Sequence, residues 1–389
     1  MVLRPRNLAW CLLAVLLAVG FIPHLPAESD KANSRLSTAD DKVQKQASDW
    51  PLFRGNALQT GVADLKPSDD LKLRWKFETK DTIEAAAAIV GDTVYIGSMD
   101  KHLYAIDLAT GKEKWKYKAG PFKAPPSVRD GVVYVGDANG LFHTIDAANG
   151  TKKWTFKTEG EITSGANFAG DNVLFGSGDE NLYCLSKDGK KVWEFKVEGG
   201  PVNGSPVVIG ERTFVAGCDS VLHVLDTTKG KELGAVELEG QVAATAAVVG
   251  EQLYVGTMTG QFQAVDWKNA KVLWTFEAER RPQAYYASAA VTDKLVIAGS
   301  RDKRVYALER GTGKEKWSFL TEGRVDSSPV VAGSQVYAAS LDGHLYVLDL
   351  TNGKELKKIK LGEEVLASPA VGKGCLIVGN DKGEVFCYE

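Results

Sequence analysis

Histidine is the first residue type to examine for chemistry, because imidazole binds zinc and transfers protons near neutral pH. The chain has five histidines, and four of them lie beyond residue 27: His102, His143, His223 and His344. They are spread along the chain, whereas zinc ligands commonly occur in short spacings such as H-x-H or H-x-x-x-H. The chain also has no G-x-S-x-G, phosphate-binding-loop or H-E-x-x-H motif. We therefore predict no metal ligand and no catalytic residue, and the sequence favours a protein that is not an enzyme.

Cysteine is the second residue type with chemistry. Cys11 lies inside the N-terminal apolar run, and the rest of the chain holds Cys184, Cys218, Cys375 and Cys387. No C-x-x-C spacing and no adjacent pair is present, and these four lie in strand-like apolar segments. We expect them to be buried free thiols, since cysteine often acts as a small core residue.

An internal repeat supplies the elements that position these residues. The segment from Val94 to Asp107 recurs along the chain, and a small residue always stands at the position of Gly97. Its equivalents are Gly136, Gly176, Ala216, Gly256, Gly299, Ala339 and Gly379, at steps of 39, 40, 40, 40, 43, 40 and 40 residues. This regularity indicates one structural unit repeated along the chain.

Each repeat contains four short runs rich in Val, Ile, Tyr or Phe, separated by Gly, Asp and Asn at turn positions. Four strands in a repeat of this length are typical of a β-propeller blade. The last repeat stops after about three strands, while an orphan strand, Leu73 to Phe77, precedes the first complete repeat. We therefore predict an all-β fold: an eight-bladed propeller of four-stranded antiparallel blades, whose N-terminal strand completes the C-terminal blade.

Each blade ends in a shared motif, seen as Ala105-x-Asp107-x-x-x-Gly111-Lys-x-x-Trp115. The Asp can accept hydrogen bonds from the turn, the Gly adopts a conformation other residues resist, and the Trp is a flat apolar slab. We predict that the tryptophans dock neighbouring blades: Trp75, Trp115, Trp154, Trp193, Trp274 and Trp317. Gly234 and Lys357 replace the tryptophan in two blades, where we expect weaker docking.

The motif A-x-D-x-x-x-G-K-x-x-W resembles the tryptophan-docking motif of the quinoprotein alcohol dehydrogenase-like propellers, also called PQQ-like repeats. The resemblance covers about residues 70 to 389. It implies one of two kinds of protein: a dehydrogenase that holds pyrroloquinoline quinone and Ca²⁺ in its funnel, or a non-enzymatic scaffold like the outer-membrane protein assembly factor BamB. The dehydrogenases carry an adjacent cysteine pair and long insertions, which this chain lacks. Scaffolds of the second kind carry a lipidated cysteine, and no such cysteine follows the N-terminal segment.

The residues expected at the funnel rim test the quinone alternative. Repeat alignment places Glu84, Lys123, Asn203 and Asp326 there, with Thr163, Ala243, Tyr286 and Leu366 at the equivalent positions. The oxygen-bearing side chains belong to distant blades, whereas Ca²⁺ needs convergent oxygen ligands. We therefore predict no quinone, calcium or other cofactor. A small ligand or glycan bound at this rim is a further alternative.

Two segments depart from the plain repeat. The 43-residue step lengthens a blade connection that contains Arg280, Arg281, Tyr285 and Tyr286, the candidate partner-binding residues, because insertions in propeller loops often form binding surfaces. The segment Trp50-Pro51-x-Phe53-Arg54-Gly55-Asn56 is interpreted as a plug that packs over the seam of the ring.

The N-terminus sets the expected location. Arg4 and Arg6 precede an apolar run from Leu8 to Ile22, a pattern typical of a secretory signal. We expect a signal peptide or uncleaved anchor over 1–27, a polar linker over 28–49 and the propeller over 50–389. A net charge of -3 gives no general attraction to nucleic acid or anionic lipid. The sequence thus predicts an exported scaffold that binds envelope proteins or peptides, attached to a membrane only through a retained N-terminal segment.

Overall fold

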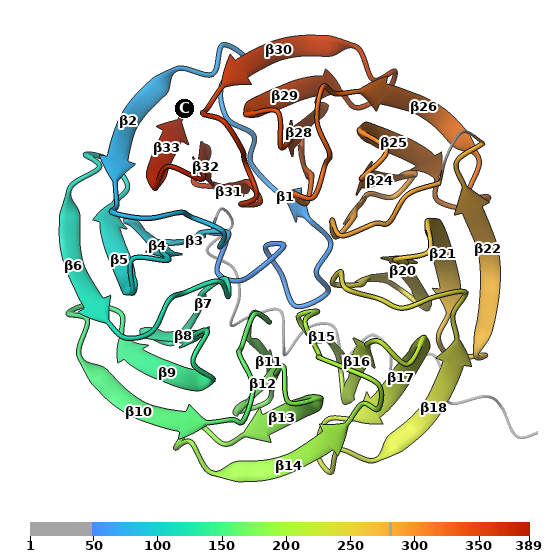
Figure 1. The fold of residues 1–389 in the computed structure, drawn as a ribbon, viewed down its shortest axis with the longest axis horizontal. Coiled ribbons are helices and arrows are strands. Elements are labelled where there is room, and N and C mark those ends of the chain that lie inside the picture. Colours follow the sequence, from blue (N-terminus) through green and yellow to red (C-terminus); the bar gives the residue numbers. More distant parts are fainter. Residues whose placement is uncertain (1–48, 280–281) are drawn as a thin grey trace, which may run out of the picture. The chain divides into compact units, whose positions relative to one another are not determined.

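The computed structural model describes residues 49–279 and 282–389, and the predicted signal and all of the predicted linker except Asp49 lie outside this part of the chain. The described residues form eight sheets arranged as blades around a central axis (Figure 1). The all-β, eight-bladed prediction is confirmed. Within the same residues, no helix is long and apolar enough to cross a membrane.

The first blade illustrates the strand order and the burial pattern of the repeat. Its strands β3 (Ala88–Val90), β4 (Thr93–Gly97), β5 (His102–Asp107) and β6 (Glu113–Lys118) pair antiparallel in chain order. Strands β4 and β5 are apolar almost throughout because neighbouring blades cover both of their faces. Strand β6 alternates between exposed and partly buried residues, as expected of the outermost strand.

Six further blades repeat this order from the axis outward. Blades 2 to 4 contain β7 (Ser127–Arg129), β8 (Val132–Gly136), β9 (Leu141–Asp146), β10 (Lys152–Lys157), β11 (Asn167–Ala169), β12 (Asn172–Gly176), β13 (Asn181–Leu185), β14 (Lys191–Lys196), β15 (Val207–Ile209), β16 (Arg212–Ala216), β17 (Val221–Asp226) and β18 (Glu232–Glu237). Blades 5 to 7 contain β19 (Ala247–Val249), β20 (Gln252–Gly256), β21 (Gln261–Asp266), β22 (Lys271–Glu277), β23 (Ala290–Val291), β24 (Leu295–Ser300), β25 (Arg304–Glu309), β26 (Glu315–Leu320), β27 (Val330–Ala332), β28 (Gln335–Ala339), β29 (His344–Asp349) and β30 (Glu355–Lys360).

The eighth blade joins the two ends of the propeller. Strands β31 (Ala370–Gly372), β32 (Cys375–Gly379) and β33 (Glu384–Tyr388) come from the C-terminus, and β2 (Leu73–Glu78) pairs antiparallel with β33 as the outermost strand (Figure 1). Trp75 lies opposite Cys387 in this pairing. The predicted closure is therefore present, and the outer edge of the last blade is covered by a strand from the start of the ring.

Neighbouring blades meet through tryptophan and glycine. The indole Nε1 of each docking tryptophan donates a hydrogen bond to a carbonyl of the next blade, and its ring lies against the motif glycine of that blade. The pairs are Trp75 with Gly111, Trp115 with Gly150, Trp154 with Gly189, Trp193 with Gly230, Trp274 with Gly313 and Trp317 with Gly353. A Cβ on any of these glycines would lie within 2.8 Å of the indole, so the two positions depend on each other.

The two blades without this tryptophan use other contacts. Beyond Gly234, the equivalent of the receiving glycine is Ala270, and Trp267 of blade 5 instead packs back on Phe214 of blade 4 with a ring separation of 5.2 Å. Lys357 donates from Nζ to the carbonyl of Leu71 at 3.0 Å, which replaces the indole hydrogen bond at the junction between blades 7 and 8. These two junctions are therefore held by contacts other than the tryptophan–glycine pair.

Candidate functional site: the plugged axis and the rim

The segment from Trp50 to Ala63 crosses the centre of the ring (Figure 1). Trp50 and Ile89 of the innermost strand β3 exchange backbone hydrogen bonds of 2.7 and 2.8 Å. Carbonyls of the segment then accept from inner-strand N–H groups blade after blade: Pro51 from Val128, Ala57 from Val208, Leu58 from Val248, Thr60 from Val291 and Gly61 from Val331, at 2.7 to 3.1 Å. The segment satisfies amide groups that would otherwise face the axis. The prediction of a plug over the seam is thus corrected: it fills the axis and bonds to blades far from the seam.

The plug enters and leaves on one face of the ring. The Asp49 carboxylate accepts from the Gly91 amide at 3.2 Å and from Lys373 Nζ at 3.0 Å, both in turns between first and second strands. At the other end, β1 (Val62–Ala63) pairs in parallel with β27. The chain thus returns toward the same set of turns before it reaches β2.

Arg54 anchors the plug. Its side chain is 1% exposed and donates to the carbonyls of Ala289 and Ser328 at 3.2 Å, and to that of Pro329. Burial lowers the pKa of Arg54 to about 9, which leaves the guanidinium charged at neutral pH. Carbonyl dipoles therefore hold this charge between blades 6 and 7. A Cβ on Gly61 would lie 2.0 Å from the guanidinium, which explains a glycine at that position.

The opposite face carries a rim of eight partly buried residues, one from each connection between blades. They are the residues expected from the repeat alignment: Glu84, Lys123, Thr163, Asn203, Ala243, Tyr286, Asp326 and Leu366. The residue before each rim position is buried, as Ile83 and Phe122 show. Because the chain follows the same course in every blade, these side chains form a ring around the mouth of the axis.

The rim residues of blades 6 and 7 form one cluster of contacts with Arg301. Arg301 donates from Nε and Nη2 to both oxygens of Asp326, at 2.8 to 3.1 Å. Its guanidinium carbon lies 3.6 Å from the centre of the Tyr286 ring. The hydrogen bond to Asp326 raises the pKa of Arg301 above its ordinary value. A cation stacked on an aromatic face and clamped by a carboxylate is a rigid group of the kind that protein interfaces use.

Other rim residues form separate pairs. Lys123 Nζ lies 3.5 Å from Glu161 Oε2, and the Thr163 hydroxyl donates to Asn203 Oδ1 at 3.0 Å. The structure therefore brings the predicted rim residues onto one ring but not to one point. Among residues 49–279 and 282–389, no group of three or more His, Cys, Asp or Glu side chains is arranged to hold a metal ion.

A quinone with Ca²⁺ does not fit this donor set. Such a site needs several oxygens that converge on the ion. Asp326 is bound by Arg301, the Asn203 oxygen accepts from Thr163, and Glu84 stands on blade 1. The plug also uses the inner-strand amides along the axis.

The candidate partner-binding loop divides into three parts. Arg280 and Arg281 lie outside the described residues and stay predictions. Tyr286 is a partly buried rim residue. Tyr285 is 1% exposed, with a Cβ that would collide with any side chain at Gly256 and a ring 5.5 Å from that of Phe262. It occupies the buried position that precedes each rim residue, so it packs between blades.

Sequence reasoning missed a belt of hydroxyl groups below the rim. Each hydroxyl accepts from a backbone amide of the preceding blade, at 2.7 to 3.0 Å. In each pair the amide of the first residue donates to the hydroxyl of the second: Gly165 to Ser205, Ser205 to Thr245, Thr245 to Ser288, Ser288 to Ser328 and Ser328 to Ser368. The recurrence of Ser or Thr at this repeat position was a signal that could have revealed it.

An all-β ring of eight such blades, docked by tryptophan and glycine, defines a β-propeller of the PQQ-like repeat class. A family model described as outer membrane protein assembly factor BamB matches residues 61–201, 157–233 and 178–389. These matches span most of the chain, and the protein belongs to this family.

Individual relatives are distant. The outer membrane protein assembly factor BamB of Burkholderia pseudomallei is 25% identical over 158 residues, which are 39% of this chain and 40% of that protein, so the match spans well under half of the relative's length. The crystal structure of BamB from Moraxella catarrhalis has a TM-score of 0.70 at 20% identity, covering 82% of this chain and 97% of that one. Quinohemoprotein alcohol dehydrogenase from Comamonas testosteroni has a TM-score of 0.77 at 15% identity, covering 92% and 83%. At these identities the two structures show a shared fold only.

Proposed function

We propose that this protein is a non-catalytic scaffold of the bacterial cell envelope that binds a protein partner on the rim face of its propeller. The observation that carries the proposal is the plug. Its carbonyls accept hydrogen bonds from inner strands of blades on opposite sides of the axis, so the chain itself occupies the place where a funnel ligand would bind. With the axis occupied by the plug, we infer that the ring of side chains around the rim binds a macromolecule and not a small buried ligand.

The rim supplies suitable groups for such a surface. The Tyr286–Arg301–Asp326 cluster is rigid and partly exposed, and Lys123 and Glu84 add charges of both signs around the ring. Tyr and Arg often contribute most to the energy of protein interfaces. Arg280 and Arg281, which come shortly before Tyr286 in the sequence, are sequence-based candidates. Family membership and the N-terminal signal pattern support an envelope location.

The test is co-purification of the full chain from envelope extracts of its own organism. A rim variant, Lys123→Glu with Tyr286→Ala, is compared with Lys112→Glu, which reverses an exposed charge in a turn on the opposite face. We expect one specific envelope protein to be retained by the wild type and the control and lost by the rim variant. Equal retention by all three proteins, or retention of none, would overturn the rim as the binding surface.

A further inference from the structure

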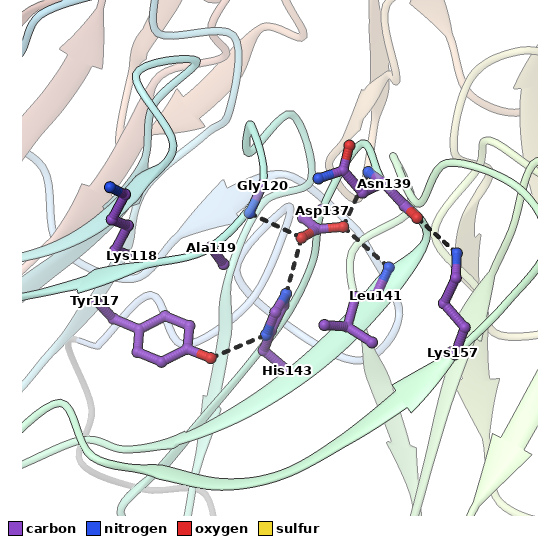
Figure 2. Close-up of a pocket in the computed structure, with 9 residues that line it drawn as sticks. All are labelled: Tyr117, Lys118, Ala119, Gly120, Asp137, Asn139, Leu141, His143 and Lys157. Carbon is purple, nitrogen blue, oxygen red and sulfur yellow. Dashed lines mark hydrogen bonds and ion pairs between the residues drawn. The ribbon is translucent and has the colours of Figure 1, made fainter.

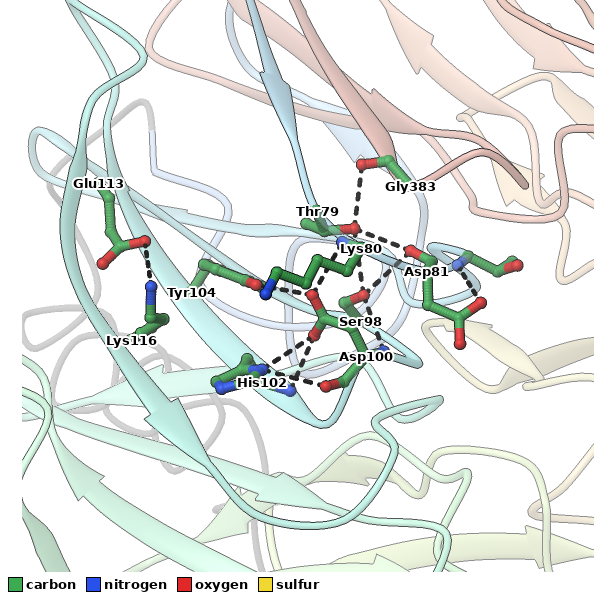
Figure 3. Close-up of polar contacts among 11 residues, drawn as sticks. Thr79, Lys80, Asp81, Ser98, Asp100, His102, Tyr104, Glu113, Lys116 and Gly383 are labelled. Atoms are coloured by element: carbon green, nitrogen blue, oxygen red, sulfur yellow. Dashed lines mark hydrogen bonds and ion pairs between the residues drawn. The ribbon is translucent and has the colours of Figure 1, made fainter.

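One contact recurs in blades 1, 3, 6 and 7. An aspartate in the turn after the second strand accepts a hydrogen bond from a tyrosine hydroxyl on the third strand, as in Asp100 with Tyr104 at 2.7 Å (Figure 3). The other pairs are Asp179 with Tyr183, Asp302 with Tyr306 and Asp342 with Tyr346. A phenylalanine from the outer strand of the preceding blade packs edge-on against each tyrosine, as Phe77 does on Tyr104. The arrangement is a structural joint between blades.

Blade 2 changes every member of this joint. Asp137 stands at the position of Ser98, Asn139 at that of Asp100, and His143 at that of Tyr104. The packing phenylalanine becomes Tyr117, whose ring lies 5.5 Å from the His143 ring. Four coordinated replacements exchange a tyrosine and aspartate pair for a buried chain of Tyr, His and Asp.

Asp137 is the acceptor at the inner end of this chain (Figure 2). The Asp137 carboxylate accepts from the amides of Gly120, Asn139 and Leu141, and lies 3.0 Å from His143 Nε2. Burial raises the pKa of Asp137, but the hydrogen bonds from His143 and the amides outweigh it and hold the pKa below its usual value. An ionised Asp137 requires Nε2 of His143 to donate.

The Tyr117 hydroxyl completes the chain. It lies 3.2 Å from His143 Nδ1. With a neutral imidazole that donates from Nε2, Nδ1 accepts from the Tyr117 hydroxyl. In that state the lone pairs of the Tyr117 oxygen are available to a hydrogen-bond donor.

A cavity of about 380 Å³ opens beside this chain, lined by Tyr117, Lys118, Asn139, His143 and Lys157 among others. The Asp137 side chain is 2% exposed, and its carboxylate already interacts with His143 and three backbone amides. The exposed lining charges are two lysines, and Lys157 is held in place by a 2.7 Å bond to the Asn139 carbonyl. The cavity thus offers cations at its margin and a hydroxyl acceptor at Tyr117.

We propose that this cavity binds a small polyhydroxy carboxylate of the sugar-acid class. The carboxylate pairs with Lys157, which the Asn139 carbonyl holds at one end of the cavity, and a ligand hydroxyl donates to the Tyr117 oxygen. The volume lies near the lower end of the range for small-molecule sites, which suits a single sugar ring. The site lies between blades 1 and 2, away from the plug, and does not depend on the proposed scaffold role.

The test is isothermal titration of the full chain with sodium galacturonate at millimolar concentrations, with glucose as the neutral control ligand. We expect saturable binding of galacturonate, weakened by salt, and no binding of glucose. Tyr117→Phe should weaken binding about tenfold, the effect of losing one hydrogen bond of about 1.4 kcal/mol. Tyr104→Phe, which changes a tyrosine of the neighbouring joint outside the cavity, should leave the affinity unchanged.

A second variant separates binding from folding. Tyr117→Phe with Asp137→Ser, Asn139→Asp and His143→Tyr restores the joint found in blade 1 and removes the Tyr117 oxygen, so the protein should fold while galacturonate binding weakens at least tenfold. Absence of galacturonate binding, equal binding of glucose, or unchanged affinity in Tyr117→Phe or the quadruple variant would each overturn the proposal.

Discussion

The indole Nε1 of Trp75 donates a hydrogen bond of 2.8 Å to the carbonyl of Leu108. Trp75 belongs to the strand that completes blade 8, and Leu108 to blade 1, so this bond crosses the junction between the last and first blades. The ring of Trp75 also covers Gly111, where φ is +71°. One tryptophan thereby fixes both the seam and the turn of the next blade.

Substitution at Gly111 measures this contact. Gly111→Ala should lower the free energy of unfolding by about 3 kcal/mol, of which about 1 kcal/mol is the cost of positive φ and the rest is the collision with Trp75. Gly131→Ala is the matched control, since φ there is +72° and no atom lies within 4 Å of the added Cβ. Denaturant unfolding of both variants should differ by about 2 kcal/mol; equal losses would mean that the indole gives way.

The plug makes a prediction about Arg54. Arg54→Met removes the donors from three buried carbonyls and should destabilise the fold by about 3 kcal/mol, because unsatisfied buried acceptors cost about 1 to 3 kcal/mol each and the removal of a buried charge offsets part of the loss. Arg324→Met, at an exposed arginine, should change the free energy of unfolding by less than about 0.5 kcal/mol. An Arg54→Met protein as stable as the wild type would show that the guanidinium is not the anchor.

Asp137 sets a pH dependence. Its folded pKa is lowered, so the unfolded chain takes up a proton first as pH falls below about 5, near the ordinary carboxylate pKa of about 3.9. The stabilisation by Asp137 is therefore complete above that range and is lost as pH falls through the folded pKa. Asp137→Asn should lose about 2 kcal/mol at neutral pH and show a shallower loss of stability toward acid pH. Parallel curves of stability against pH for the two proteins would contradict this assignment.

The plugged axis leads us to expect no response to pyrroloquinoline quinone. Melting temperature should stay unchanged with added quinone and Ca²⁺, and the visible spectrum of the quinone should be that of the free compound. A quinoprotein dehydrogenase treated in the same way serves as the positive control. A saturable rise in melting temperature that follows RT ln(1 + [L]/Kd) would show a cofactor site and remove the scaffold proposal.

The sequence predicts this fold well because one short motif in each repeat contains the residues that form the blade and its junctions. Trp115 and Gly111 lie close together in one motif, and their recurrence at regular steps reveals the strands, the junctions and the rim. The place of the plug could not be predicted in the same way. Arg54 contacts carbonyls more than 200 residues away, and nothing near it in the sequence indicates which blades supply them.

Two further points show the same limit. Tyr285 was expected in a binding loop by its aromatic type, although its register one residue before a rim position predicts a buried side chain. His143 looked isolated because its partners, Tyr117 and Asp137, come from different strands, one of them in the preceding blade. Comparing each repeat position across blades, and not only motifs along the chain, would have shown that blade 2 is unusual.

The most direct measurement is photo-crosslinking from single positions of the full chain in cells of its own organism. A photoreactive residue replaces Tyr286 on the rim, and in a second protein it replaces Gly131 in an exposed turn of the opposite face. The account predicts one discrete adduct with another envelope protein from position 286 and none from position 131. No adduct from position 286, or the same adducts from both positions, would contradict the conclusion that the rim face holds the partner.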